Sequence, residues 1–518
     1  MNPMQNERRL PGFASAVTRA LDASGGSRNP DEGARGTAIL LAVLAAALAF
    51  RLYQVAVNDF PLNDGALFYE FVRAIGASFP GLPDRVSYNG HAIPFAYPPL
   101  SFWFGALLTR AGVDPLEVTR IVPLFMNGVY VLLFGLLLVR TGHSRLFAAL
   151  ALLFLCTRLG SFQWLIMGGG LSRGFGSVFF LLTLIAVLPA FTSRRNDVPW
   201  RALILAGPAV GGAILSHLEW GIDAAAAVVL AVALGSQSIA VIAKSCVAAG
   251  LAAALVITPW LALVIATHGI EPFIAAGQTG SWELSFIADK FMFLVRSALL
   301  NPFIIVGVAG LIWRRQYFWL ILMVLVPLIT PRHAVTVISL PLSVLAAAGV
   351  LATVAFLRKV VPSHAIITAA TTIAVIAVLG LRVARDTQTF GETLRPLGTH
   401  QRSAMTWVSA NTPGSRYAVV TLSGWQADHV AEWFPTLANA RSVTTVQGSE
   451  WLPDGAYQDL ARKSDAMKAQ SECGALVAST RAFGTADYVW SELHPHCYQR
   501  AGYRPVYRNP QVMIFKSP

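Results

Sequence analysis

Residues 317–356 read YFWLILMVLVPLITPRHAVTVISLPLSVLAAAGVLATVAF, and this stretch decides the fold class. The run is long enough for two helical crossings of a bilayer, because one crossing takes ~20 predominantly apolar residues. Arg332 and His333 are its only basic side chains and it has no acidic ones; both follow Thr330-Pro331 at the expected turn between the two helices. The stretch therefore predicts a transmembrane helical hairpin.

The rest of the chain repeats this pattern. Further runs that are nearly free of charge lie at 38–57, 120–139, 174–191, 202–216, 222–266, 291–312 and 365–381. Of the 518 residues, 55% are hydrophobic and 13% are charged, against roughly 25% charged in soluble domains. Such a chain needs lipid to cover its apolar surface, so we expect a polytopic α-helical membrane protein.

The distribution of positive charge predicts how the chain is threaded. The net charge is +12, but Lys and Arg collect in short loops, which is typical of a membrane protein and argues against a nucleic-acid partner. Residues 1–36 form a polar tail before a retained first helix and are expected to be cytoplasmic. Cytoplasmic positions are expected for the following basic residues: Arg8, Arg9, Arg19, Arg28, Arg35, Arg140, Arg145, Arg194, Arg195, Arg201, Arg314, Arg315, Arg358 and Lys359.

This threading gives about 11 transmembrane helices within residues 37–384, provided that 98–111 is an interfacial helix and not a crossing. Residues 58–117 then form the first outer loop. Residues 385–518 become an extracytoplasmic α/β domain, with a helix at 403–410 and strands at 417–422, 486–490 and 511–515. Cys156 and Cys246 lie in apolar runs, whereas Cys473 and Cys497 lie in the outer domain, where a disulfide between them stays open.

Ionisable residues at the outer side are the best sequence clue to chemistry. The first outer loop opens with Asp59, Asp64, Tyr69 and Glu70 and ends with His91 and Tyr97. A carboxylate near the membrane plane can take a proton from an acceptor hydroxyl. The alternative is that these acids only keep the loop in water.

Cations at the same side are candidates for binding a phosphate. Arg332 and His333 interrupt an apolar run, Arg158 and Arg173 stand at helix ends, and His217 and Glu219 form a polar break between two helices. A guanidinium offers a fixed fork of donors that suits phosphate. The alternative for the arginines is snorkelling to the interface. Gly168-Gly169-Gly170 lacks the strand and Lys of a phosphate loop and indicates flexibility or close packing.

These motifs together resemble the membrane glycosyltransferases of the GT-C fold. The resemblance rests on Asp64 to Tyr69, Tyr97-Pro98-Pro99-Leu100, Leu171-Ser172-Arg173-Gly174, and the tail segments 432–435 and 446–451. It is nearest in kind to protein O-mannosyltransferases and lipid A aminoarabinose transferases, often classed as family 39. Their loop often reads Asp-Glu-x-x-Tyr; here Gly65 replaces the Glu, which leaves Asp59 as a rival to Asp64.

The resemblance implies an inverting transfer of a hexosyl or pentosyl group from a polyprenyl-phosphate sugar to an extracytoplasmic lipid, glycan or protein. It implies Asp64 as general base in a multi-pass protein of a bacterial plasma membrane. The expected donor-phosphate residues are Arg332, His333, Arg173 and Arg158. The expected substrate-binding residues are Tyr69, Glu70, Arg85, His91, Tyr97, His217 and Glu219.

Three questions stay open at this stage. No cofactor is firmly predicted, but a divalent cation (Mg²⁺, Mn²⁺ or Ca²⁺) is compatible with the outer acids and histidines, although no closed ligand set at metal spacing appears in the sequence. A secondary transporter would show an inverted repeat and paired broken helices, and none is evident. A third reading is an envelope assembly protein whose outer domain binds the partner.

Overall fold

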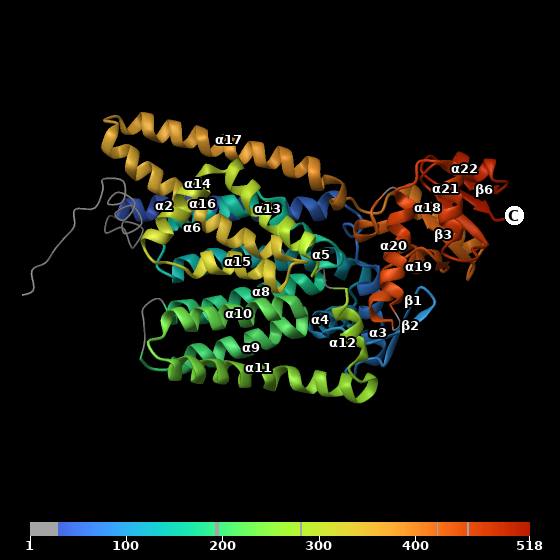
Figure 1. Ribbon diagram of the computed structural model, residues 1–518, viewed down its shortest axis with the longest axis horizontal. Helices are drawn as coiled ribbons and strands as arrows, with labels where there is room; N and C mark the ends of the chain where they lie inside the picture. Colours follow the sequence, from blue (N-terminus) through green and yellow to red (C-terminus); the bar gives the residue numbers. More distant parts are fainter. Residues whose placement is uncertain (1–29, 192–195, 280–281, 422, 453–454) are drawn as a thin grey trace, which may run out of the picture.

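The computed structural model describes residues 30–191, 196–279, 282–421, 423–452 and 455–518 (Figure 1). Most of the polar N-terminal tail, with Arg8, Arg9, Arg19 and Arg28, lies outside the described residues, and so do Arg194 and Arg195. Their predicted cytoplasmic position therefore stays a prediction.

The larger part of the molecule is a bundle of apolar helices that run nearly parallel to one another (Figure 1). Among the described residues, 7 helices are long and apolar enough to cross a membrane. They are α2 (Pro30–Val57), α5 (Pro115–Arg140), α8 (Gly170–Val187), α10 (Leu218–Gly235), α11 (Ile239–His268), α16 (Ala334–Val360) and α17 (His364–Phe390). The expectation of a multi-pass α-helical membrane protein is confirmed.

Four shorter apolar segments complete the bundle. Helices α13 (Leu284–Leu300) and α14 (Pro302–Trp313) form a pair bent by 104°, and α6 (Arg145–Cys156), α9 (Trp200–Ser216) and α15 (Phe318–Ile329) are single short helices. Each expected crossing falls on a long helix, on the bent pair or on one of these short helices. The number of true crossings stays a prediction.

Helix α16 is the centre of the bundle. Its first half is buried almost without interruption, from Ala334 to Val350. Gly349 lies against α14 so closely that a Cβ atom would overlap the carbonyl of Phe303, and Gly307 of α14 meets Leu345 in the same way. Small residues permit this backbone approach, which is the usual source of tight helix packing in membranes.

Helices α11 and α17 form the rim. Large apolar side chains such as Leu255 and Ile373 are exposed there, as expected for helices whose outer faces meet lipid. Figure 1 shows α17 and α11 along opposite sides of the bundle.

Short elements gather at one end of the bundle, next to the C-terminal part of the chain (Figure 1). From the first outer loop come α3 (Ala66–Ser78), the antiparallel pair β1 (Arg85–Tyr88) and β2 (His91–Pro94), and α4 (Leu100–Arg110). Others are η1 (Leu159–Ser161), α7 (Gln163–Ile166) and α12 (Glu271–Gly277), whereas η2 (Leu188–Phe191) follows α8 at the opposite end of the bundle. Helix α4 covers the range expected to be interfacial and is too short to count as a span.

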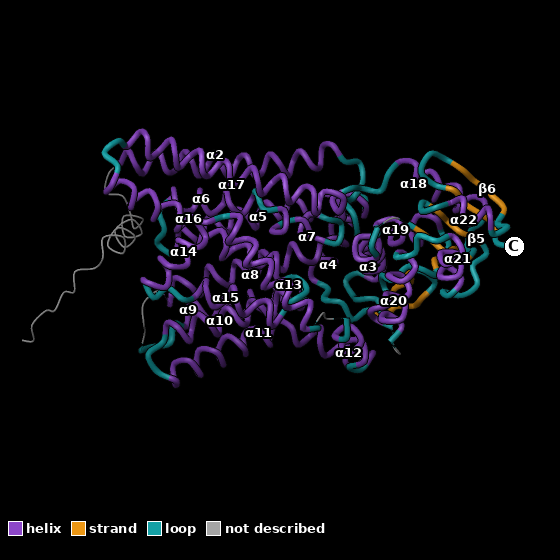
Figure 2. Tube along the Cα trace, turned by 45° about the horizontal axis from the view of Figure 1, so that its top comes forward, coloured by secondary structure: helices purple, strands orange, loops and turns teal. Residues whose placement is uncertain are grey.

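The C-terminal part folds around one five-stranded sheet of order β4-β3-β5-β7-β6. Strand β3 (Arg416–Val420) pairs in parallel with β4 (Arg441–Ser442) and β5 (Tyr488–Ser491), whereas β7 (Met513–Lys516) is antiparallel to β5 and to β6 (Arg504–Arg508). Figure 2 shows these strands gathered among helices near the C-terminus. The helical elements are η3 (Gly391–Leu394), α18 (Thr399–Asn411), η4 (Trp425–Ala427), α19 (His429–Ala438), η5 (Ser449–Trp451), α20 (Ala456–Lys468), α21 (Cys473–Arg481) and α22 (Pro495–Arg500).

Helix α18 and strands β3, β5 and β7 fall on the segments that the sequence indicated. The domain boundary at residue 385 and the extracytoplasmic side stay predictions.

The C-terminal part is joined to the first outer loop by specific polar contacts. Asn89 exchanges two hydrogen bonds with the backbone of Ser442, at 2.8 and 2.7 Å. The hydroxyl of Tyr88 donates to the carbonyl of Glu432 at 2.7 Å, and the indole N–H of Trp433 donates to the carbonyl of Asn63 at 3.0 Å. The two segments thus form one interface at the end of the bundle.

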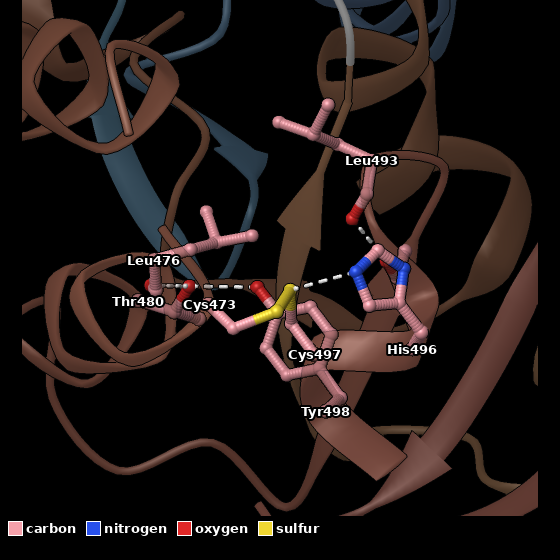
Figure 3. The surroundings of a disulfide bond; sticks show 8 residues. Cys473, Leu476, Thr480, Leu493, His496, Cys497 and Tyr498 are labelled. Atoms are coloured by element: carbon pink, nitrogen blue, oxygen red, sulfur yellow. Dashed lines mark hydrogen bonds between the residues drawn. A yellow bond between two sulfur atoms is a disulfide. The ribbon is translucent and has the colours of Figure 1, made fainter. Parts of the chain in front are cut away.

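A disulfide joins Cys473 to Cys497 and so links α21 to α22 (Figure 3). The hydroxyls of Thr480 and Tyr498 are 2.8 Å apart beside it, and the ring of His496 lies 3.5 Å from the Cys497 sulfur. The pairing left open by the sequence is therefore present in the structure.

The disulfide predicts a thiol count. In denaturant without reductant only Cys156 and Cys246 should react with a thiol reagent, and reduction should expose Cys473 and Cys497 as well. The full chain is expressed in a membrane and alkylated, and mass spectrometry then counts the alkylated cysteines before and after reduction. Alkylation of all cysteines before reduction would contradict the disulfide and the oxidising location that it needs.

Candidate functional site

Asp64 lies in a tight turn at the end of the bundle that adjoins the C-terminal part. In this turn the backbone of Asn63 is left-handed (φ 51°), and Gly65 has a φ of 126°. Residues other than Gly rarely adopt the φ of Gly65. The amide of Gly168 donates to the carbonyl of Leu62 at 2.9 Å, and that of Gly169 donates to Asp64 Oδ1 at 2.8 Å. A Cβ atom on Gly169 would collide with the Asp64 carboxylate. The glycine triplet therefore serves close approach, one of its two expected roles.

Arg173 holds the other oxygen of the same carboxylate. Its guanidinium lies 3.3 Å from Asp64 Oδ2 and 3.3 Å from the carbonyl of Trp164, and it stands over the Trp164 ring. The Asp64 side chain is 13% exposed and that of Arg173 is 20% exposed. The pair is thus sheltered yet open enough for a substrate to reach it.

A second carboxyl group reaches this turn from the C-terminal part. Glu432 Oε1 accepts a hydrogen bond from the amide of Gly65 at 2.9 Å, and the residue is 6% exposed. Burial, reinforced by the nearby charge of Asp64, raises the pKa of Glu432 to about 8. At neutral pH the site therefore pairs a carboxylate with a protonated carboxyl, an arrangement common where acid–base chemistry occurs.

A cluster of histidines and acids adjoins this pair. Helix α9 ends at Ser216 and α10 begins at Leu218, which leaves His217 at the break, and His333 precedes α16. One ligand atom each from His217, Glu219 and His333 lies within 4.8 Å of the others. The rings of His217 and His333 are stacked with centroids 6.0 Å apart.

His333 is oriented from behind by a buried acid. Its Nε2 lies 2.5 Å from Asp223 Oδ2, and the hydroxyl of Thr330 donates to Asp223 Oδ1 at 2.8 Å. The Nδ1 atoms of both His217 and His333 have no hydrogen-bond partner among the described residues. A carboxylate behind a histidine is a familiar arrangement around metal ligands.

This group fits a divalent metal ion. Two imidazole nitrogens and one carboxylate favour Zn²⁺ or Mn²⁺ over Mg²⁺ or Ca²⁺, which prefer oxygen ligands. The other group of suitable atoms in the described chain, Cys473, His496 and Cys497, has both sulfurs in the disulfide. Of the ions considered from the sequence, the donor set thus favours Mn²⁺.

Arg332 and Tyr97 connect the two clusters. Tyr97 lies 3.3 Å from the hydroxyl of Ser172 and within electrostatic reach of Arg173, Arg332 and Glu219. Arg332 donates to the hydroxyl of Thr279 at 3.2 Å and lies within electrostatic reach of Glu219 and Glu450. The two groups therefore belong to one polar basin, with two arginines that could face an anion.

The sequence-predicted residues divide into two sets. The structure brings together Asp64, Arg173, Arg332, His333, His217, Glu219 and Tyr97. Tyr69 and Glu70 flank this basin on α3, where Tyr69 meets the Trp433 ring at 6.0 Å and Glu70 pairs with Arg73 at 3.3 Å. Burial raises the pKa of both flanking groups.

Four predicted residues lie elsewhere. Asp59 is 73% exposed and pairs with Arg402 at 2.7 Å, and Arg85 donates to the carbonyl of Ala92 in the exposed hairpin. His91 lies in the same hairpin beside Arg441, and burial lowers its pKa. Arg158 contacts Ser297 at 3.0 Å and lies near Arg382 and Asp386, on the α17 side of the bundle. Residues near one end of a bundle need not come together in space, so the roles expected for these four residues stay predictions.

Three residues of the site, Asp223, Glu432 and Glu450, had no role predicted from the sequence. Asp223 stands at the start of an apolar run, where an acid is costly unless it has a partner. Its position in the sequence could therefore have indicated a buried polar site. Glu432 and Glu450 belong to the tail segments that carried the resemblance, but nothing in their spacing indicates that Glu432 contacts Gly65 or that Glu450 lies near Arg332.

Comparison with known proteins adds to this geometry. No family model and no curated protein matches the chain. Two solved structures of ArnT from Cupriavidus metallidurans, one bound to undecaprenyl phosphate and one in the apo state, align over 92% of this chain and 98% of theirs, with a TM-score of 0.53 each.

This chain has the GT-C fold. Identity to the two ArnT structures is 13% and 14%, so the likeness shows the GT-C fold alone. The oligosaccharyltransferase of Archaeoglobus fulgidus, solved with a tethered acceptor peptide, aligns over 92% of this chain and 74% of its own at 13% identity and a TM-score of 0.49. The GT-C architecture expected from the sequence is confirmed.

The raised pKa of Glu432 predicts how stability depends on pH. The folded state keeps this proton up to about pH 8, whereas an unfolded glutamate releases it near 4.5. Between these values the folded state binds more protons, so the free energy of unfolding falls as pH rises. Glu432→Gln keeps an oxygen acceptor for Gly65 but cannot ionise. Its melting temperature relative to wild type should therefore rise between about pH 5 and 8 and level off above.

Melting curves of the full chain in nanodiscs measure this difference, with Glu472→Gln, at an exposed position, as the control. Parallel pH profiles of wild type and Glu432→Gln would refute a buried protonated carboxyl at this position.

The histidine cluster predicts metal binding. Titration calorimetry of the full chain with Mn²⁺ and with Zn²⁺ should show one site, which His217→Ala abolishes. Asp223→Asn should weaken it about 10- to 100-fold, the usual effect of losing the group that orients a ligand. His496→Ala is the matched control, because His496 stands beside the disulfide. Equal binding by wild type and His217→Ala would show that the ion is held elsewhere.

Proposed function

We propose that this protein is an inverting membrane glycosyltransferase that moves a sugar from a polyprenyl-phosphate donor to an acceptor at the outer face of the membrane. The observation that carries the proposal is the Asp64 carboxylate, held by the Gly169 amide and by Arg173 at the outer end of a GT-C bundle. These donors hold the carboxylate in one orientation, as a general base requires.

The reaction follows from this arrangement. An acceptor hydroxyl attacks the anomeric carbon of the donor sugar while its proton passes to Asp64. The bond between that carbon and the phosphate oxygen breaks on the opposite face, and its electron pair leaves with the polyprenyl phosphate. Attack and departure on opposite faces invert the anomeric configuration, and the proton that Asp64 takes leaves later to water.

The leaving phosphate needs positive charge near it. Arg332 stands in the same polar basin as Arg173, and a guanidinium matches phosphate oxygens with two parallel donors. Preorganised cations that meet developing negative charge are commonly the largest catalytic contribution. One ArnT structure of the same fold holds undecaprenyl phosphate, which supports a lipid-linked phosphate as the donor.

A divalent ion held by His217, Glu219 and His333 would supply further positive charge beside the leaving group. Whether or not an ion is bound, Asp223 orients the ring of His333 through its contact with Nε2, and the hydroxyl of Thr330 orients Asp223. Glu432, protonated near neutral pH, holds the amide of Gly65 and so sets the position of Asp64.

We infer the orientation from the loops. Arg140, Arg314, Arg315, Arg358 and Lys359 lie in or next to short loops, which places those loops inside by the positive-inside rule. Residues 58–117 and 385–518 then lie outside, in a bacterial plasma membrane. A disulfide in the C-terminal part supports that side.

Replacing Asp64 tests the proposal. In nanodiscs, Asp64→Asn should lower sugar transfer from polyprenyl-phosphate donors by about 10²- to 10⁴-fold, the usual contribution of a general base, while donor binding persists. Asp59→Asn is the matched control, since Asp59 is exposed and paired with Arg402; it should keep near wild-type turnover and settle which acid is the base.

The assay uses a panel of radiolabelled polyprenyl-phosphate hexoses and pentoses, with sugar release and transfer scored separately. If the folded wild type consumes no donor, or if Asp59→Asn and not Asp64→Asn abolishes turnover, the proposed mechanism is wrong. Absence of donor binding would favour transport or envelope assembly instead.

A further inference from the structure

A cavity of about 160 Å³ lies between α12 and the segment of η5 and α20. One wall comes from the bundle, through Glu271, Ile274 and Gln278, and the other from the C-terminal part, through Glu450, Tyr457 and Gln458. It is well below the ~300–1,000 Å³ of pockets that enclose whole drug-sized ligands. It therefore suits one ring-sized unit of a larger molecule.

The residues that line the cavity indicate which kind of chemical group it can bind. The described lining residues include two carboxyl groups, two amides and one phenol, but no Lys or Arg. An anionic group would meet unfavourable charge and no cation among them. Hydroxyl groups, by contrast, can donate to the acids and accept from the amides.

Apolar side chains also line the cavity, beside its acids and amides. Ile274 and Leu452 also line the cavity, and the ring of Tyr457 meets that of Trp425 edge-on at 5.5 Å. The indole N–H of Trp425 is buried with no hydrogen-bond partner among the described residues. Aromatic faces beside amides and acids suit a sugar ring, which has apolar C–H faces and polar edges.

The cavity adjoins the proposed active site. Glu450 forms part of its wall and faces Arg332, which in turn donates to Thr279 just beyond α12. Trp451, next to Glu450, meets the ring of Tyr97 at 5.4 Å. A molecule seated in the cavity would thus lie beside Glu450, which is within electrostatic reach of Arg332.

We propose that this cavity is an acceptor subsite that binds a neutral sugar unit, so that the acceptor of this enzyme is a glycan or glycolipid. The inference rests on the proposed transferase function, because it gives the second substrate of that reaction. It also gives the C-terminal part a role in choosing the acceptor.

The test measures binding without relying on turnover. Saturation-transfer NMR of the full chain in nanodiscs is recorded with methyl glycosides of glucose, mannose and galactose, and with methyl glucuronide as the anionic probe. At least one neutral glycoside should give a signal, and the glucuronide should give none. Gln278→Ala and Gln458→Ala should each weaken that binding about five-fold or more, as the loss of one hydrogen bond predicts.

Gln470→Ala is the matched control. Gln470 follows α20 and bonds only the local carbonyl of Ala466 among the contacts found for it, so glycoside binding should not change. The proposal is overturned if no neutral glycoside binds wild type, if the glucuronide binds equally well, or if both cavity variants bind like wild type.

Donor turnover is scored on the same wild-type sample and keeps the two proposals apart. Glycoside binding without turnover of any donor would leave the cavity as a sugar site and reject the transferase function. Turnover without glycoside binding would keep the transferase and reject the cavity as its acceptor subsite.

Discussion

The site depends on one constraint: the turn at Asn63–Gly65 must be closed from two sides at once. On one side, the glycine triplet before α8 approaches so closely that its amides bond Leu62 and Asp64. On the other, Glu432 and Trp433 bond the backbone of Gly65 and Asn63. The positive φ angle of Asn63 is costly for a residue other than Gly, so the surrounding contacts must hold it, whereas Gly65 adopts its positive φ without that cost.

This closure explains how so many charges can share a sheltered basin. Each ion is costly to remove from water unless it has a partner. Asp64 has Arg173, His333 has Asp223, and Arg332 has Glu219 and Glu450, while Glu432 avoids the cost by keeping its proton. The basin is therefore nearly balanced in charge before a substrate enters. An arriving phosphate would compete with carboxylates for the same arginines.

The sequence predicted the bundle well, because apolar length is enforced by lipid and survives any detail of packing. It also placed Asp64, Arg173, Arg332, His333, His217 and Glu219 in candidate roles, since ions at the outer ends of apolar runs are few. The roles expected for Arg158, Arg85, His91 and Asp59 stay predictions; these residues lie apart from the others, because the sequence does not say where around the bundle a residue lies. Glu432 was beyond reach for another reason: its contact with Gly65 spans 367 positions, and no local pattern records such a pairing.

That long separation has a consequence for the making of the protein. Chain synthesis delivers Asp64 and its glycine partners early, but Glu432 and Trp433 emerge only after every apolar helix has been completed. During that interval the turn lacks half of its supports, and the wall formed by Glu450 and Tyr457 does not yet exist. Under the proposed function, a partly inserted chain would therefore not consume lipid-linked precursors, and activity would begin only when the last segment docks. The order of residues along the chain thus delays the proposed activity until the C-terminal part has been synthesised and has docked.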